Sequence, residues 1–517
     1  MKIQRYIFIF CFVVLFFFTK DPRTHILGIP SVDLFDTVTL RGLFAQQWNS
    51  EPPIFFAPIG YDWSLLIPNR IDHITFLPFS HLPFPIADNL WWFSIVFLQA
   101  CTAHRLGRYI GKDEWSGWTT MIFWLFSESF LREINLHHAP QSCLVLLPLY
   151  MEYLLKLCDT PQNHYYKIIC GIILGITTCT YFYAFPFVIL ITCFFLYRTP
   201  ISLLTIIIVS LGISLPEIFF WISKNPPLID KKQEIIYDFD WLYLFQRTPL
   251  DKSIGLSIVV PYVMYKTVHT QKKTLLYTTF FLLLFIPLWK EISSIHPLIQ
   301  RFHWPERISI FATLCVLPLV AALKKSHYLI PIIIMESFVT SYNYPFYWTS
   351  VKNELCLQNI HASSVKNVLA LPLVYQQSNL MGLHQRIHKK QMMNPLILPT
   401  GNPKDWKSWW SKHSILASLE IQSQPIPNQE AQFNKLNLDV IYYPDGGLSS
   451  KTSTEELLRL EQILGTSIDI GCAHVWWYAN ENPPTAIDGD LFREQNTGSL
   501  PSLPLFMNPF FLEKKPL

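Results

Sequence analysis

Long apolar runs alternate with short polar turns over the first two thirds of the chain. The runs cover residues 3–19, 89–106, 116–132, 140–157, 167–183, 184–197, 201–222, 255–266, 274–290, 306–323 and 327–341. A segment inside a bilayer must satisfy its backbone hydrogen bonds internally, and none of these runs alternates like a barrel strand. The pattern therefore predicts about eleven transmembrane helices within residues 1–341.

The last third of the chain has a different pattern. Residues 367–375 (NVLALPLVY), 439–444 (DVIYYP) and 474–478 (HVWWY) have the β-branched and aromatic content of short strands. Residues 454–465 (TEELLRLEQILG) place leucines on one helical face and end with glycine. We expect residues 342–517 to form a small soluble α/β domain with a disordered, proline-rich end.

Composition supports a bilayer location. Charged residues make up 15% of the chain and hydrophobic residues 50%, whereas a soluble domain usually carries about 25% charged residues. The net charge is +3 and no basic block occurs, so a nucleic-acid partner is not expected. The fold class predicted is a polytopic α-helical membrane protein with membrane lipid around it.

The spacing of the cysteines and the lack of nucleotide-binding or hydrolase motifs limit the kinds of reaction to be expected. No CxxC pair occurs among the ten cysteines, which argues against zinc or iron–sulfur ligation. Cys356 and Cys472 lie in the tail and would form one disulfide if the tail is in an oxidising compartment. This pairing stays open at the level of sequence. No Walker loop, Rossmann fingerprint, GxSxG or HExxH motif is present.

Lysine and arginine positions predict an orientation. The short turns at 105–112, 156–167, 266–273 and 324–325 are basic, as is the amino end, so the amino terminus is placed in the cytoplasm. The segments then expected together outside the cytoplasm are the loop 20–88, the turns 128–139 and 291–306, the loop 223–254 and the tail from about residue 342. We expect a multi-pass protein of the bacterial inner (plasma) membrane with a periplasmic C-terminal domain.

Two carboxylates stand out in the long first loop. Asp33 and Asp36, in SVDLFDTVTLRG, lie three residues apart at the start of a helix expected from about Thr37 to Trp48. A carboxylate near a helix N-terminus stays ionised and could deprotonate an acceptor hydroxyl as general base. Asp36 could equally be only the N-cap of that helix. Arg41 of the same stretch is a supporting candidate.

Two further clusters combine cations and carboxylates. ESFLREINLHHA (128–139) brings together Glu128, Arg132, Glu133, His137 and His138. QRFHWPERISIF (300–311) brings together Arg301, His303, Glu306 and Arg307. Ionisable groups at membrane depth are functional candidates because burying them is costly, and guanidinium forks match phosphate oxygens. The alternatives are a solvated i,i+4 pair between Glu128 and Arg132, a metal on the two adjacent histidines, and arginines that snorkel to headgroups.

These stretches resemble the GT-C class of integral-membrane glycosyltransferases, and especially the bacterial GT-C-like membrane proteins. The resemblance is carried by SVDLFDTVTLRG, NLHHAPQSCLVLLPLYMEYLLK, RFHWPERISIF and, in the tail, VLALPLVY with LHQRIHKKQMMNPLIL. It implies a catalytic acid in the first loop, which would be Asp36 or else Asp33, and basic residues facing a polyprenyl-phosphate donor. The paired adjacent acids of several characterised branches are absent.

The predicted function is transfer of a sugar, with inversion, from a polyprenyl-phosphate carrier to an extracytoplasmic glycan, lipid or protein. The donor phosphate is assigned to Arg132, His137, His138, Arg301, His303 and Arg307, with Arg41, Glu128, Glu133 and Glu306 in support. No metal site is assigned, and a divalent cation is left open as cofactor. The rival hypotheses are a transporter or lipid flippase, which would distribute charges through the bilayer depth, and a non-catalytic membrane scaffold.

Overall fold

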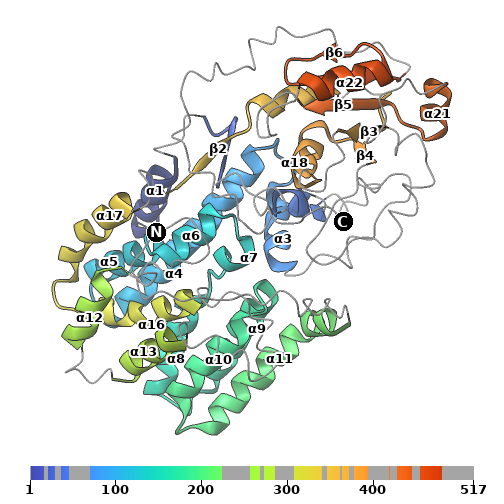
Figure 1. Cartoon of the computed structure of the whole chain (residues 1–517). Coiled ribbons are helices and arrows are strands. Elements are labelled where there is room, and N and C mark those ends of the chain that lie inside the picture. The colour runs from blue at the N-terminus through green and yellow to red at the C-terminus, as the bar shows by residue number, and fades with distance from the viewer. Residues whose placement is uncertain are drawn as a thin grey trace.

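The computed structural model shows a helical bundle with a small sheet at one end (Figure 1). It describes residues 2–16, 21–28, 37–42, 44–45, 70–223, 257–267, 273–285, 308–340, 346–360, 364–371, 378–393, 419, 428–444 and 454–479. The candidates that lie outside the described residues are Asp33, Asp36, Arg301, His303, Glu306 and Arg307. The expected proline-rich disordered end also lies outside them.

Each predicted apolar run contains at least one helix. A further helix, α3 (Arg70–Phe76), lies in the first loop, outside these runs. In the first part of the chain the helices of the runs are α1 (Lys2–Phe16), α4 (Ile86–Gly111), α5 (Glu114–Leu125), α6 (Glu128–Asn135), α7 (Ala139–Ser142), α8 (Leu147–Asp159), α9 (His164–Thr180) and α10 (Ala184–Leu196). They continue as α11 (Pro200–Ser223), α12 (Val259–Thr267), α13 (Lys273–Phe285), α16 (Ser309–Ala321) and α17 (Leu329–Thr340). Short 3₁₀ turns, η2 (Leu77–Phe79) and η5 (Ser326–Tyr328), precede α4 and α17.

The continuous helix predicted over 116–132 is wrong, because α5 and α6 are separate. Ser127 has an extended backbone (φ −66°, ψ 139°), and its hydroxyl donates to the carbonyl oxygen of Trp124 at 2.8 Å. Serine competes for backbone groups in this way at helix ends. The break lets α6 turn its charged residues into the protein instead of extending α5.

Several helices turn apolar side chains outward. Within the described part of the chain, α11 is long and apolar enough over Pro200–Phe219 to cross a membrane, and shorter apolar helices cover Ile3–Phe16, Ala184–Leu196 and Ser309–Ala321. The exposed large side chains of α11 recur every three or four residues; they are Ile201, Leu204, Ile208, Leu211, Leu215 and Phe219. An exposed apolar stripe of this length suits lipid contact. The number of eleven spans stays a prediction.

The tail contains a five-stranded mixed sheet. Its strands are β3 (Asn367–Ala370), β4 (Gln391–Met392), β5 (Val440–Pro444), β6 (Ile468–Asp469) and β7 (Ala473–Trp477), in the order β4-β3-β5-β7-β6. β3 is parallel to β4 and β5, and β7 is antiparallel to β5 and β6. Strands thus occupy each of the three stretches predicted to form them.

Helices cover both faces of this sheet. η6 (Asn353–Ile360) and α18 (Ser378–His388) pack on the face that carries Val440 and Tyr442, whereas α21 (Gln429–Lys435) and α22 (Thr454–Leu464) pack on the face that carries Ile441 and Tyr443. This is the alternation expected of a buried strand. α22 is the predicted amphipathic helix, and it ends at Gly465, whose φ of 88° favours glycine.

The two cysteines of the tail form a disulfide. Cys356 in η6 and Cys472 beside β7 are bonded, with their Cα atoms 6.1 Å apart and a separation of 116 positions in sequence. The bond fastens η6 to the sheet. The pairing that the sequence left open is therefore present.

Three segments predicted to share one side of the membrane are in contact. β1 (His25–Leu27), from the first loop, pairs antiparallel with β2 (Trp348–Ser350), at the start of the tail. The Thr37 hydroxyl donates to the His137 carbonyl at 3.1 Å, and the backbone N–H of Tyr347 donates to Asn135 Oδ1 at 3.1 Å. The first loop, the 128–139 segment and the tail therefore meet in one layer. The side of the membrane on which this layer lies stays a prediction.

Candidate functional site

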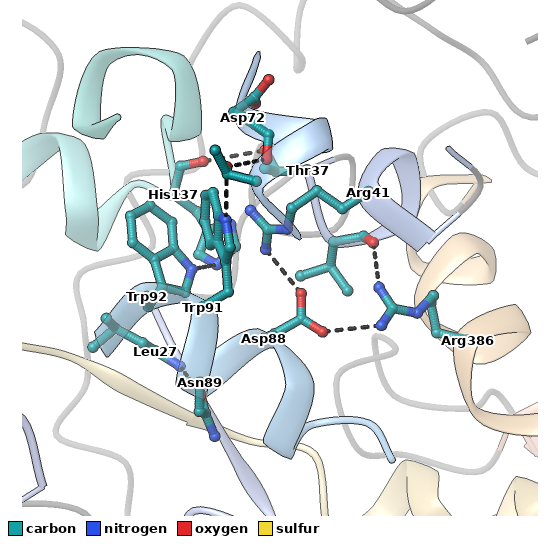
Figure 2. A network of polar contacts seen from close by, with 12 residues as sticks. Leu27, Thr37, Arg41, Asp72, Asp88, Asn89, Trp91, Trp92, His137 and Arg386 are labelled. Atoms are coloured by element: carbon teal, nitrogen blue, oxygen red, sulfur yellow. Dashed lines mark hydrogen bonds and ion pairs between the residues drawn. The ribbon is translucent and has the colours of Figure 1, made fainter. Parts of the chain in front are cut away.

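An aspartate shared by two arginines lies at the centre of this layer (Figure 2). Arg41 Nη2 donates to Asp88 Oδ1 at 2.9 Å, and Arg386 Nη2 donates to Asp88 Oδ2 at 3.1 Å. Asp88 lies in the first turn of α4, where the helix dipole favours a carboxylate. The Arg41 and Asp88 side chains are 0% and 1% exposed. Three chain segments thus bring one negative and two positive charges out of water.

The guanidinium of Arg41 lies over aromatic rings. Its Cζ is 4.2 Å from the ring centroid of Trp91 and 5.6 Å from that of Phe76. Within the part of the chain that the structure describes, Arg41 Nε and Nη1 have no hydrogen-bond partner. Leaving a buried charged donor unpaired is costly. These two N–H groups therefore suit an anionic oxygen supplied by a ligand.

His137 offers a third donor nearby. The indole Nε1 of Trp92 is 2.7 Å from His137 Nε2, and an indole N–H can only donate. Burial and, after it, the charge of Arg41 hold the pKa of His137 well below its usual range. The ring is therefore neutral, and its single proton is on Nδ1. Nδ1 is also buried and lacks a partner among the described residues.

A second charged cluster is centred on Glu133 of α6. Glu133 Oε1 accepts from Arg132 Nη2 at 2.7 Å and Nε at 3.1 Å, and its Oε2 lies 2.6 Å from His138 Nδ1. Glu128, Arg132, Glu133 and His138 are all buried. The solvated-pair alternative is therefore wrong. Among the described residues, Arg132 is paired with Glu133 instead of Glu128.

The adjacent histidines serve different clusters. His137 faces Trp92, with ring centroids 4.8 Å apart, whereas His138 bonds with Glu133. His137 has a φ of 62°, so the backbone turns sharply between the two side chains. This geometry gives no support to a shared metal on the pair, and of the described residues none is a partner for His137 Nδ1.

An aspartate–histidine pair lies on α3, in the first loop. Asp72 Oδ1 lies 2.7 Å from His73 Nδ1, and both side chains are buried. Thr75 fixes the turn by donating to the Asp72 carbonyl at 2.8 Å while accepting from Trp91 Nε1 at 3.1 Å. An imidazole oriented by a carboxylate can accept or deliver a proton through its other nitrogen.

Sequence reasoning missed several of these residues. Asp88 could have been singled out from the sequence, because a carboxylate at the start of an apolar run needs a partner when it is buried. Arg386 had no local signal, since its partner Asp88 is 298 positions away in the chain. Asp72 and His73 lie in the long first loop, but nothing in the sequence shows that they pair.

The candidates outside the described residues have described neighbours in sequence. Asp36 directly precedes Thr37, which bonds with His137, and Arg307 directly precedes Ile308, where the described α16 region begins. The structure thus brings Arg41 together with His137, and Arg132 together with Glu133 and His138. The roles assigned to Asp33, Asp36, Arg301, His303, Glu306 and Arg307 stay predictions.

Comparison with known proteins was made by sequence and by structure. No family model matches the chain, and no curated protein sequence matches it. The apo oligosaccharyltransferase of Archaeoglobus fulgidus is similar in structure, with 10% identity over 86% of this chain and 69% of that chain and a TM-score of 0.44.

Two other solved structures are similar to the chain, each at 10% identity. The match to the mycobacterial arabinofuranosyltransferase AftD covers 92% of this chain and 39% of AftD, with a TM-score of 0.49. The match to ArnT from Cupriavidus metallidurans, bound to undecaprenyl phosphate, covers 92% of this chain and 96% of ArnT, with a TM-score of 0.40. These three solved structures are GT-C glycosyltransferases.

Proposed function

We propose that this chain is a membrane glycosyltransferase that moves a sugar from a polyprenyl-phosphate carrier to an extracytoplasmic acceptor, with inversion. The observation that carries the proposal is the set of buried donors without a partner among the described residues: Nε and Nη1 of Arg41 and Nδ1–H of His137. Anionic phosphate oxygens, more than one of them, are the acceptors that such donors need for charge-assisted hydrogen bonds.

The arrangement suggests how the anion would be recognised. Arg41 presents N–H groups at Nε and Nη1 that point to different sides of the planar guanidinium, so separate oxygens would accept from them, and its ring neighbours exclude water from the guanidinium. His137 adds a neutral donor, so it contributes a hydrogen bond without a second full charge. Arg132 and His138 are held by Glu133, and we assign them a supporting role in binding the phosphate.

The proposed reaction has three parts. Asp36, or else Asp33, accepts the proton of the acceptor hydroxyl, and the hydroxyl oxygen attacks C1 of the sugar from the face opposite the phosphate. The bond between C1 and the phosphate oxygen breaks, and the leaving polyprenyl phosphate keeps the electron pair. Positive groups placed at that oxygen stabilise the developing charge in a water-poor site. Arg301, His303 and Arg307 are proposed to help hold the phosphate, with Glu128, Glu133 and Glu306 orienting the cations.

The membrane setting of the proposal rests on two features. Apolar side chains face outward on α11, which suits contact with a lipid carrier. The disulfide between Cys356 and Cys472 suits an oxidising compartment and therefore an extracytoplasmic tail. We propose the bacterial inner membrane, with the amino terminus in the cytoplasm and the tail in the periplasm.

Lipid binding by the full-length protein in nanodiscs tests the proposal. Undecaprenyl phosphate is the probe for affinity, and its glycosylated form is the probe for transfer. Arg41→Lys keeps the charge but removes the separate N–H donors of the planar guanidinium, so we expect roughly a tenfold loss of affinity, about 1.4 kcal/mol. Asp36→Asn should bind normally and lose transfer. Arg23→Met is the matched control, because Arg23 is an exposed arginine of the same loop that pairs with Asp21.

The outcomes separate the alternatives. No saturable binding of either lipid by the wild-type protein would overturn the proposal. Binding together with lipid movement across the bilayer, unaffected by Asp36→Asn, would favour the flippase alternative. Full transfer activity in Asp36→Asn and Asp33→Asn alike would remove the proposed base.

A further inference from the structure

Arg386 of the tail reaches into the first loop through two contacts. It lies on α18, and its Nη1 donates to the backbone carbonyl of Val38 at 2.7 Å while its Nη2 donates to Asp88 Oδ2 at 3.1 Å (Figure 2). Val38 belongs to the helical residues 37–42 that also carry Arg41. One guanidinium of the tail is therefore bonded to both elements that hold Arg41.

Gly42 makes room for this side chain. A Cβ added at Gly42 would lie 2.7 Å from Arg386 Nε and 3.0 Å from Nη1, closer than side chains approach one another. The guanidinium is also flanked by Phe76 and Phe84, with Cζ 5.4 and 5.5 Å from their ring centroids. Apolar surroundings strengthen the two hydrogen bonds because water cannot compete for them. Arg386 is thus fixed in place instead of lying loosely on a surface.

Asp88 connects the tail to the donors of the proposed phosphate site. Its Oδ1 is bonded to Arg41 and its Oδ2 to Arg386. If Arg386 were absent, Oδ2 would be a buried and unpaired carboxylate oxygen next to the open N–H groups of Arg41. A carboxylate and a guanidinium readily form a two-bond fork, and that fork would consume donors that a phosphate needs.

We propose that Arg386 is a positioning residue through which the tail keeps Arg41 open for substrate. It holds Oδ2 of Asp88 away from Arg41 and holds the helix at 37–42 by its carbonyl. The inference rests on the proposed function for the identity of the anion, a polyprenyl phosphate. The mechanical link between the tail and the first loop rests only on the contacts of Arg386.

Two measurements on the full-length protein test the two parts separately. Hydrogen exchange of the amides at 37–42, measured without ligand, reports the link; we expect at least about a threefold faster exchange in Arg386→Met. Affinity for undecaprenyl phosphate reports the open donors; we expect about a tenfold loss in the same variant. Arg459→Met is the control, because Arg459 pairs with Glu456 inside the tail and should change neither measurement.

Two further variants exclude simple misfolding. Adding Asp88→Asn to Arg386→Met should restore most of the affinity, because a neutral amide cannot form the ionic fork with Arg41. Gly42→Ala should displace an intact Arg386 and speed exchange at 37–42, yet add nothing in the Arg386→Met background. A merely structural role for Arg386 predicts no rescue by Asp88→Asn.

Each result has a definite meaning. Unchanged exchange in both Arg386→Met and Gly42→Ala would overturn the link. Faster exchange with unchanged lipid affinity would overturn the role in keeping Arg41 open. If the wild-type protein binds no polyprenyl phosphate while exchange at 37–42 still rises in Arg386→Met, the proposed function fails and the link between tail and loop stands.

Discussion

At the scale of single residues, burial decides which protonation states the protein holds. His384 of α18 is buried, and its Nδ1 lies 3.1 Å from the hydroxyl of Tyr442 on β5. Burial lowers the pKa of His384 to about 3. Burial also raises the pKa of Tyr442 above its usual range, so the phenol stays protonated. A neutral histidine is thus built into the interface between α18 and the sheet.

The stability of the tail should therefore depend on pH through His384. Its folded pKa of about 3 lies below the ordinary value of 6.5, so the unfolded chain binds more protons between these values. Stability is then complete above pH 6.5 and falls as pH drops towards 3, by at most about 1.4 kcal/mol per pH unit. We expect the melting temperature of the tail to fall over this range and His384→Gln to flatten the dependence. His474→Gln, at a half-buried position on β7, is the control. An unchanged slope in His384→Gln would contradict the prediction.

At the scale of elements, glycines set the distance between α9 and α11. A Cβ at Gly171 would meet Cβ of Val209 at 2.6 Å, and one at Gly175 would meet Cβ of Ile213 at 2.7 Å. The two glycines are four residues apart and so lie on one face of α9. Small residues at this spacing let helix backbones approach closely in a membrane. The α9–α11 contact therefore depends on these positions having no side chain.

Gly175→Leu should separate the two helices. Overpacking a close contact costs about 1–3 kcal/mol, so we expect a clear drop in the melting temperature of the bundle. Gly212→Ala on α11 is the matched control, because a Cβ there meets nothing within 4 Å. The control should melt like the wild type. Equal melting temperatures for the two variants would show that the close approach contributes nothing.

Regular elements were predictable from sequence because their signals are local. The strands β3, β5 and β7 and the helix α22 lie where the alternation and the leucine spacing predict them. The break at Ser127 was missed, because an apolar period continues across it while a single hydroxyl bond ends the helix. Arg41 and His137 were singled out by residue type, but their open donors depend on Asp88 and Trp92, whose contacts arise only from the fold.

At the scale of the whole molecule, the tail and the bundle are tied by contacts between distant parts of the chain. β1 pairs with β2, and Arg386 bonds with Asp88. Such pairings are set by topology, so no sequence window contains both partners. The disulfide, which lies within the tail, is a long-range contact that the sequence offered as a possibility, because only two cysteines lie in the tail.

That disulfide gives a test of both stability and compartment. A cross-link that closes a loop of this length typically stabilises a fold by about 2–4 kcal/mol, so a reducing agent should lower the melting temperature of the tail. A variant with Cys356→Ala and Cys472→Ala should start at the lower value and not respond to the reducing agent. Cys101→Ala, at a free cysteine of α4, should respond like the wild type.

The redox state of Cys356 and Cys472 in the cell reports the side of the membrane on which the tail lies. If the tail lies outside the cytoplasm, protein extracted with its thiols blocked should yield the peptide that links Cys356 to Cys472 in mass spectrometry. If both cysteines are recovered as blocked thiols, the tail faces a reducing compartment. The first loop and the 128–139 segment contact the start of the tail, so the polar layer would then face the cytoplasm too. The proposed orientation would be reversed, and with it the side on which the acceptor must be sought.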